Sequence, residues 1–313
     1  MKLKPGCLRK KDSIHVISPA SSPANQEVYR KGINFLQEKG YQVSAGRHIL
    51  EKQDYLAGND GQRANDLERA LFSNVQAVFT TRGGYGCARL IPFLESLQKV
   101  PDIKTFMGYS DLTTLLLYAY TRWNWITYYG PMVAVEMGKE SFKDSCTERW
   151  MSSLMDKNPE NIMLPHLPYQ HMECLIPGKA EGELVGGCLS ILTPALGTSY
   201  CPDFKGKILF FEEIGEPVYK VDRMLMHLAN AGVFSKVSGV IIGEMTGCES
   251  NSDIIRLKDV FYDILAPFNI PVLMHAPFGH GKEKFIFPIG IQAYLDSENA
   301  EIRFLEKLWE DNN

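Results

Sequence analysis

Apolar residues in the first half of the chain gather in short runs separated by longer segments with helical spacing. The run Ser13–Ser18 and the run that begins at Ala77 are typical of buried strands, whereas residues 26–39 and 60–73 carry apolar positions three and four apart. Gly40 ends the first helical segment, as glycine commonly does at a helix C-terminus. Strands alternating with helices predict a mostly parallel sheet with flanking helices.

The pattern changes near Pro165, where a segment rich in Pro, Gly and His shows no helical period. We interpret residues 161–180 as a linker between an N-terminal domain (1–160) and a C-terminal domain (181–313). Apolar runs beyond the linker predict further strands, and the last two, IQAYLD and AEIRFLE, alternate polar and apolar residues as antiparallel strands do. The predicted fold is therefore α/β, with a mostly parallel N-terminal sheet and a C-terminal α/β domain of mixed strands.

Composition and charge narrow the class of protein. The 313 residues are 45% hydrophobic, which is ample for two domain cores. The net charge of −4 and the scattered basic residues give no basis for predicting a nucleic-acid or anionic-membrane partner. Seven cysteines without a C-x-x-C pair are typical of a reducing compartment. We see neither a secretory signal nor an apolar run of membrane-spanning length, and we expect a cytosolic protein.

The stretch KTFMGYSDLTTLLLYAY, which begins at Lys104, predicts a strand, a tight turn and a helix with Ser110 at the corner. One interpretation is that Ser110 caps the helix, since Ser and Asp both accept hydrogen bonds from a first turn. The other is a nucleophile elbow, which exposes a serine hydroxyl above a sheet. Leu112 stands where the usual G-x-S-x-G pattern has its last glycine. The choice between a cap and a nucleophile therefore depends on whether the chain supplies a base, an orienting acid and an oxyanion hole.

A serine nucleophile requires a base, and His280 is the candidate among the seven histidines. It lies in a loop after an apolar strand, between Gly279 and Gly281, which allow the backbone to present the imidazole outward. The alternative is that His280 is a solvated loop residue. The other histidines lie in predicted strands, a polar connection, the linker or an amphipathic helix.

The acid that would orient this imidazole is predicted from KILFFEEIGEP, where three glutamates follow an apolar strand. Glu212 and Glu213 point to opposite faces, because neighbouring side chains alternate along a strand. We choose Glu212, which is still within the strand, where a buried carboxylate needs a partner. Glu213 and Glu216 are interpreted as polar loop residues or as anions near the start of the next helix.

Backbone amides are the remaining requirement, since an acyl-transfer site needs an oxyanion hole. The RGGYG turn at residues 82–86 follows a strand, so its N–H groups can converge on an anion. It does not match the dinucleotide fingerprint G-x-G-x-x-G. We expect the N–H groups of Gly84 and Asp111 to form the hole. Ser110, Glu212 and His280 each come at the end of an apolar strand run, and they occur in that order along the chain. This is the arrangement of a serine hydrolase that has a Glu in place of the usual Asp.

Several motifs together resemble the LD-carboxypeptidase family of serine peptidases, which includes the microcin-immunity peptidases. They are RGGYG, GYSDLT, PGKAEGELVGGCLSIL, ILFFEEIGEPVYKVDRML and FGHG, in family order over nearly the whole chain. The resemblance implies a Ser–His–Glu triad at Ser110, His280 and Glu212, without metal or other cofactor, in a homodimer. Glu213 and Cys188 depart from the family pattern, in which Asp and Asn are common.

The resemblance further implies a cytosolic enzyme that removes the terminal D-alanine from muropeptide tetrapeptides in peptidoglycan recycling. Arg82 or Arg223 is then the candidate for binding the terminal carboxylate through a bidentate pair. Arg223 alternatively pairs with a neighbouring helix carboxylate. Gly83 and Tyr85 complete the predicted substrate-binding residues.

Two other functions stay open. A microcin-type peptidyl-nucleotide substrate would stack its base near Tyr85 and Tyr109, although tyrosines such as those in TYYGPM pack cores more often. A two-domain protein that closes on a small ligand without chemistry is the other alternative, and Ser110→Ala would leave its function intact. A metal enzyme is disfavoured, because the sequence has no H-x-x-x-H or clustered Cys/His spacing.

Overall fold

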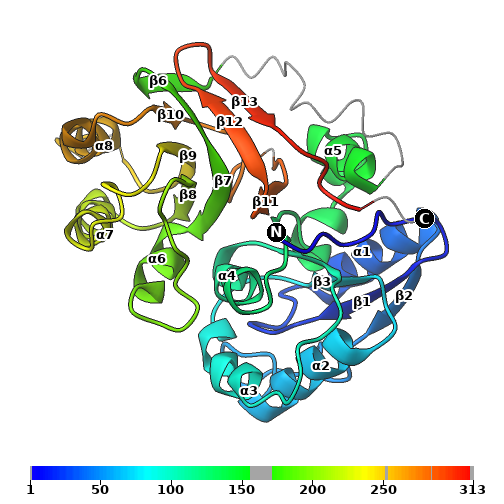
Figure 1. Cartoon of the computed structure of the whole chain (residues 1–313). Coiled ribbons are helices and arrows are strands. Elements are labelled where there is room, and N and C mark those ends of the chain that lie inside the picture. Colours follow the sequence, from blue (N-terminus) through cyan, green and yellow to red (C-terminus); the bar gives the residue numbers. More distant parts are fainter. Residues whose placement is uncertain (1, 156–170, 251–252, 283, 311–313) are drawn as a thin grey trace.

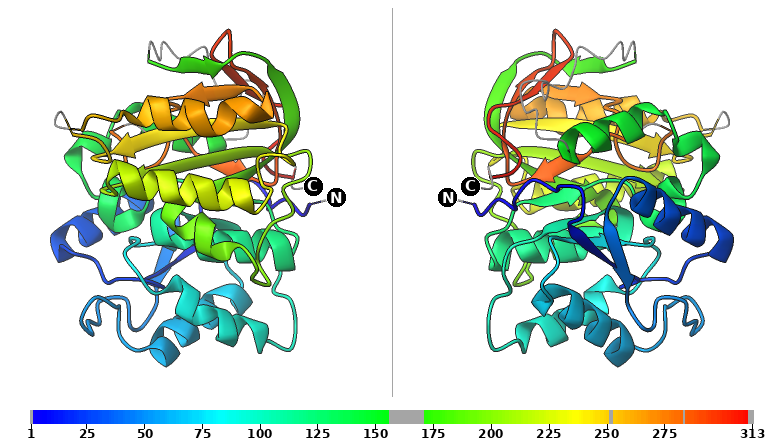
Figure 2. Two further views of the ribbon diagram at one scale, coloured as in Figure 1. Left: turned by 90° about the vertical axis from the view of Figure 1, so that its left-hand side faces the viewer. Right: turned by 90° about the vertical axis from the view of Figure 1, so that its right-hand side faces the viewer.

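The computed structural model describes residues 2–155, 171–250, 253–282 and 284–310. Two β-sheets form the two halves of the molecule, each with helices packed on its outer sides (Figures 1 and 2). The first sheet has the strand order β11-β5-β4-β3-β1-β2, and the second has the order β13-β12-β7-β8-β9-β10-β6.

The first sheet is parallel from β2 through β5, and only β11 runs antiparallel. Its strands are β1 (Ser13–Ile17), β2 (Gln42–Ala45), β3 (Ala77–Thr80), β4 (Thr105–Gly108), β5 (Thr127–Tyr129) and β11 (Phe287–Ile289). The helices of this half are α1 (Gln26–Glu38), α2 (Asp60–Phe72), α3 (Ile91–Glu95), α4 (Thr113–Arg122) and α5 (Cys146–Met155). The predicted mostly parallel sheet with flanking helices is confirmed.

The boundaries of α1 and α2 follow from local signals in the sequence. Asn25 caps α1 by accepting from two first-turn N–H groups, and Gly40 follows the helix with a φ of +96°. Asn59 and Gln62 form a reciprocal capping box at the start of α2. These caps satisfy N–H groups that would otherwise lack partners.

The second sheet is mixed, as predicted. A parallel core of β7 to β10 is flanked by antiparallel β6, β12 and β13. Its strands are β6 (Glu173–Ile176), β7 (Lys179–Cys188), β8 (Ile208–Ile214), β9 (Gly239–Thr246), β10 (Val272–Met274), β12 (Gln292–Asp296) and β13 (Glu301–Phe304). The helices are α6 (Leu189–Leu192), α7 (Val218–Asn230) and α8 (Leu257–Leu265). All of β8 except its last residue is buried, as expected of a central parallel strand.

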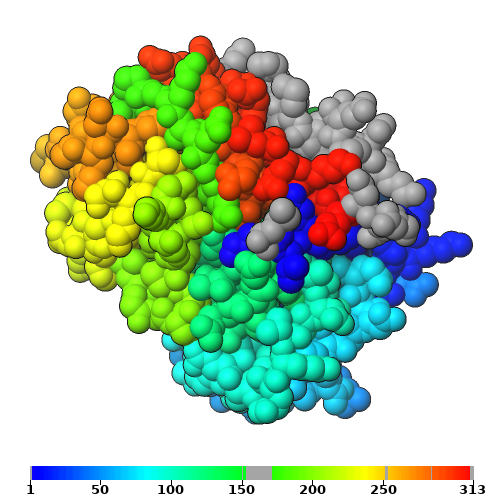
Figure 3. Space-filling model, viewed as in Figure 1, coloured from blue at the N-terminus to red at the C-terminus, as the bar shows by residue number. Residues whose placement is uncertain are grey.

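The two halves are joined by more than one crossing of the chain. Residues 161–170 of the predicted linker lie outside the described residues, and its described part contains β6 and the start of β7. β11 returns from the second half to pair with β5 of the first sheet, a strand that the sequence analysis did not predict. Segments near the two ends of the chain also lie side by side, since Gly6 pairs with Glu310 (Figures 1 and 3).

Helix α4 lies where the two halves meet (Figure 1). Its residues Thr113 to Tyr120 are all buried. Thr113 Oγ1 accepts the backbone N–H of Cys188 at 3.1 Å, and the Tyr120 hydroxyl donates to Glu183 at 2.7 Å. The elbow that precedes α4 is thereby held against the carboxyl ends of β7 and β8, where α/β sheets commonly bind ligands.

Candidate active site

Ser110 lies at the turn between β4 and α4, with a left-handed backbone (φ +66°). This conformation costs a residue other than glycine about 1–2 kcal/mol. Among the described residues no side chain caps the 3-10 turn at Ser110–Leu112 or the start of α4, so Ser110 is not a capping residue. Gly83 lies so close that a Cβ there would be 2.9 Å from Ser110 Oγ. A strained serine facing a glycine is the geometry of a nucleophile elbow.

Glu212 and His280 form a hydrogen-bonded pair between β8 and the loop after β10. Oε2 of the fully buried Glu212 accepts from His280 Nδ1 at 2.8 Å and from its backbone N–H at 3.1 Å. Gly279 has a φ of +95°, and a Cβ there would lie 2.5 Å from Glu212 Cδ. Because a carboxylate only accepts hydrogen bonds, a neutral imidazole carries its proton on Nδ1 and leaves Nε2 free to accept one.

In the described part of the chain, the neighbouring glutamates do not contact His280. Glu213 is a buried residue of β8, so its interpretation as a polar loop residue is wrong. The Glu213 carboxylate points away from His280 and accepts the backbone N–H groups of Ser190 at 2.6 Å and Ile214 at 2.9 Å. Burial raises the pKa of Glu213. Cys188 lies 3.5 Å from this carboxylate, and burial raises the pKa of its thiol well above the ordinary value. Glu216 pairs with Lys220 on α7 at 3.0 Å. Of the three glutamates, Glu212 alone contacts His280 among the described residues.

Two tyrosines connect the Glu212–His280 pair to the serine. The Tyr129 hydroxyl accepts the backbone N–H of Ser110 at 3.1 Å and donates to Glu212 Oε1 at 2.5 Å. The Tyr109 ring packs edge-on against the imidazole of His280, with centroids 4.9 Å apart. The sequence analysis missed the role of Tyr129, because alternation in TYYGPM gives no signal beyond core packing.

The glycine turn at residues 83–86 is fixed from two sides. The buried Asp111 carboxylate accepts the Cys87 N–H at 2.8 Å, although burial raises the pKa of Asp111. The buried Arg63 guanidinium donates to the carbonyls of Gly86 at 2.9 Å and Pro19 at 2.5 Å, and pairs with Asp60. The turn is therefore held rigidly beside Ser110, and an oxyanion hole requires donors with this kind of fixed placement.

A buried ion pair fixes the loop that carries His280. Lys284 Nζ donates to the carbonyl of Gly281 at 2.5 Å and lies 3.5 Å from a carboxylate oxygen of Glu136. The same carboxylate accepts the Tyr109 hydroxyl at 2.9 Å. The loop is thus tied to the first half of the molecule, on which Ser110 lies.

The predicted substrate-binding residues lie in different settings. Arg82 is half-buried and forms no ion pair within the described ranges. Tyr85 is exposed and packs edge-on against Tyr55, with ring centroids 5.6 Å apart. Arg223 is exposed on α7 beside a cavity of about 620 Å³ that Ser190 also lines. In the part of the chain that the structure describes, no ion pair joins Arg223 to a carboxylate.

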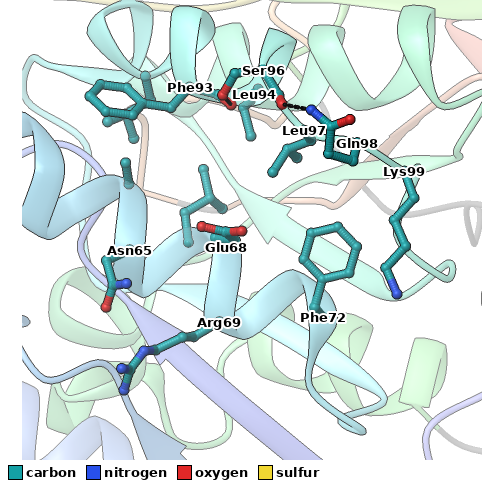
Figure 4. Close-up of a pocket in the computed structure, with 13 residues that line it drawn as sticks. Asn65, Glu68, Arg69, Phe72, Phe93, Leu94, Ser96, Leu97, Gln98 and Lys99 are labelled. Carbon is teal, nitrogen blue, oxygen red and sulfur yellow. Dashed lines mark hydrogen bonds between the residues drawn. The ribbon is translucent and has the colours of Figure 1, made fainter.

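The described residues contain no group of three His, Cys, Asp or Glu side chains that is arranged to hold a metal ion. A cavity of about 800 Å³ lies between α2 and the segment 90–99, where Phe72, Phe93 and Lys99 line it (Figure 4). None of the predicted site residues lines that cavity. No helix in the described ranges is long and apolar enough to cross a membrane.

Comparisons with known proteins match most of the chain. Two family models match the chain: the LD-carboxypeptidase N-terminal domain over residues 14–130 and the LD-carboxypeptidase C-terminal domain over residues 181–295. A probable murein peptide carboxypeptidase of Bacillus subtilis is 33% identical over 307 residues, which are 94% of this chain and 92% of the relative. The murein tetrapeptide carboxypeptidase of Pseudomonas aeruginosa is 31% identical over 291 residues, 90% of this chain and 92% of that protein.

The same architecture occurs in solved structures. MccF in complex with glutamyl sulfamoyl guanosine superposes with a TM-score of 0.89 at 24% identity, over 98% of this chain and all of that one. At this identity the match shows the shared two-domain fold alone.

Proposed function

The chain belongs to the LD-carboxypeptidase family of serine peptidases, and from that premise we propose that it removes the terminal D-alanine from muropeptide tetrapeptides by acyl transfer from Ser110. The observation that carries this proposal is the buried Glu212 carboxylate holding Nδ1 of His280 at 2.8 Å, joined through one hydroxyl to the elbow of Ser110. A serine carboxypeptidase needs these three groups and no metal.

In the proposed reaction, Nε2 of His280 accepts the proton of the Ser110 hydroxyl as Oγ attacks the carbonyl before the terminal residue. The backbone N–H groups of Gly84 and Asp111 stabilise the tetrahedral oxyanion. The loss of one such donor typically costs about 100- to 1,000-fold in kcat. The imidazolium then protonates the leaving D-amino acid, and water releases the acyl group by the same steps in reverse. Glu212 stabilises the imidazolium throughout and stays ionised.

Recognition of the free carboxylate distinguishes a carboxypeptidase from an endopeptidase. Arg82 is the better of the two predicted candidates, because it adjoins the glycine turn beside Ser110, whereas Arg223 lies on α7. Gly83 and Tyr85 would contact the same end of the substrate. Arg223, on the exposed face of α7, would contact a more distant part.

The first experiment follows free D-alanine released from L-Ala-γ-D-Glu-meso-diaminopimelate-D-Ala by the wild type, by Ser110→Ala, and by the wild type in EDTA. We expect release that persists in EDTA and disappears in the variant, with unchanged thermal unfolding as the control for folding. Release that survives Ser110→Ala would refute the mechanism. A substrate ending in D-alaninamide should be cleaved poorly, and Arg82→Gln should raise KM more than Arg223→Gln.

A peptidyl-nucleotide substrate is the second candidate, and the 28% identity over 317 residues to the microcin C7 self-immunity protein MccF of Escherichia coli supports it. The exposed Tyr85 and Tyr55 offer a surface for stacking a base, whereas Tyr109 is buried and cannot offer its face as the sequence analysis suggested. Cleavage of an aminoacyl-nucleotide phosphoramidate without any release of D-alanine would select this function.

The cellular setting is part of the same proposal. An enzyme of recycled muropeptides acts in the cytosol, which agrees with seven cysteines that are all free thiols. We also propose a homodimer. Light scattering of the purified chain tests the assembly, and fractionation of cells tests the location.

A further inference from the structure

One hydroxyl group contacts both halves of the proposed catalytic machinery. The Tyr129 side chain is 1% exposed, and its oxygen lies 3.1 Å from the Ser110 nitrogen and 2.5 Å from Glu212 Oε1. An amide N–H can only donate and a carboxylate can only accept, so the phenolic proton must point toward Glu212. The direction of both hydrogen bonds is therefore fixed.

We propose that Tyr129 is a positioning residue that sets the Glu212 carboxylate and the Ser110 elbow against each other. This inference rests on the proposed function, because it assigns a role relative to the same triad. Ser110 comes from the first sheet, and Glu212 comes from the second. Tyr129 ends β5, which pairs with β4 directly before the elbow, and its hydroxyl reaches across the junction. The oxygen atom of Tyr129 thereby fixes the distance between the Glu212 carboxylate and the backbone of Ser110.

The two oxygens of Glu212 have separate partners. Oε2 accepts from both N–H groups of His280, which leaves Oε1 to Tyr129. A buried carboxylate oxygen that loses its donor is costly, so without the hydroxyl the carboxylate would rotate or draw in water. Either movement would shift the imidazole. The same hydroxyl holds the N–H of Ser110 in its left-handed conformation.

The hydroxyl also affects the charge that His280 experiences. Burial beside Glu212 raises the pKa of the Tyr129 phenol well above its ordinary value, so the group stays a donor over the working pH range. A donor on Oε1 draws negative charge away from Oε2 and weakens its hold on the imidazolium proton. Without the Tyr129 hydroxyl, Glu212 holds the imidazolium proton more strongly, and neutral His280 becomes available as the base only at higher pH.

Packing alone does not require the hydroxyl. The Tyr129 ring contacts Tyr109, Phe210 and Phe278 edge-on, and a phenylalanine ring makes the same contacts. The adjacent Tyr128 provides a matched control. It is equally buried, and its hydroxyl donates to the Leu308 carbonyl at 2.6 Å on the other side of the strand, away from Glu212.

The test compares Tyr129→Phe with Tyr128→Phe in the full chain. Each variant loses one buried hydroxyl and keeps its ring. The measurements are kcat and KM for D-alanine release, the pH–rate profile, the rate at which a fluorophosphonate labels Ser110, and thermal unfolding. The other charged groups near the imidazole are unchanged in both variants. They are Glu136 and Lys284 beyond the Tyr109 ring, and Glu244, which packs against Gly281 of the same loop.

We expect Tyr129→Phe to lower kcat and the labelling rate by about 10- to 100-fold, since a misplacement of a reacting group by about 1 Å can cost about 100-fold. KM should change little, and the acidic limb of the pH–rate profile should move to higher pH. Tyr128→Phe should alter stability only. Two results would overturn the proposal. One is that Tyr129→Phe and Tyr128→Phe have equal kinetics. The other is that the activity loss in Tyr129→Phe is explained by its lower thermal stability and the pH–rate profile does not move.

The labelling arm separates this inference from the proposed function. If the wild type releases no D-alanine but Ser110 is labelled rapidly, the substrate is wrong and the role of Tyr129 is still decided by the two labelling rates. If Ser110 in the wild type is not labelled, the triad itself fails, and the role of Tyr129 fails with it.

Discussion

Replacing Gly279 by alanine tests how closely the His280 loop must approach Glu212. Gly279 has a φ of +95°, and a Cβ there would lie 2.5 Å from Glu212 Cδ. This distance is about 1 Å inside the usual carbon–carbon contact of about 3.5 Å. The carboxylate or the loop must therefore move by about 1 Å, which the 2.8 Å hydrogen bond to His280 does not tolerate.

The expected magnitude has two parts. A left-handed backbone costs an alanine about 1–2 kcal/mol, and disruption of a hydrogen bond to a charged group costs about 1.5–3 kcal/mol. Gly279→Ala should therefore lower the free energy of unfolding by about 2.5–5 kcal/mol. Because a displacement of about 1 Å in a reacting group can cost about 100-fold, kcat/KM should fall by at least this factor.

Gly197→Ala is the matched control, because Gly197 has a φ of +80° and nothing within 4 Å of an added Cβ. It should show the backbone cost alone and keep full activity. The measurements are urea unfolding and D-alanine release for both variants. If Gly279→Ala lost no more stability than Gly197→Ala and kept its activity, the close packing of the loop against Glu212 would not hold His280 in place.

Three further substitutions test the supports of the site. Arg63→Met should destabilise the protein by about 3–5 kcal/mol and lower kcat, because the glycine turn loses its buried anchor. Arg89→Gln, which removes an exposed ion pair to the same Asp60, should change neither stability nor kcat appreciably. Urea unfolding and steady-state kinetics measure both variants. Burial raises the pKa of Glu213, so its contribution to stability is full below its ordinary pKa and is lost as the pH rises through the folded-state pKa. Glu213→Gln should therefore gain stability relative to wild type as the pH rises above 4.5, and a stability difference that does not vary with pH would contradict this. Lys284→Met should leave Glu136 buried without its cation and cost about 3–5 kcal/mol, with slower fluorophosphonate labelling as a sign that the His280 loop has loosened.

The local order of elements was accessible from the sequence, because it depends on patterns within a few residues. Helix spacing, the Asn caps and the alternation in the last two strands act over one or two turns of chain. The strand, turn and helix around Ser110 were also predicted, as was the opposite orientation of Glu212 and Glu213. The choice of Glu212 relied on its place within the strand, but β8 continues through Glu213 to Ile214, so only the alternation of side chains separates the two glutamates.

The tertiary structure decided what these residues contact. Glu212 and His280 are 68 residues apart, and only the parallel order of β8, β9 and β10 brings the two together. Only the backbone amide of Asp111 was given a role from the sequence, and the structure adds one for its carboxylate, which accepts the Cys87 N–H and anchors the glycine turn. Nothing in the residues around Tyr129 distinguishes its hydroxyl from that of Tyr128, because alternation assigns each to a face and does not say what lies opposite. Side-chain pairing across two sheets depends on how the strands are ordered and packed, and for that reason a pattern read along one strand cannot contain it.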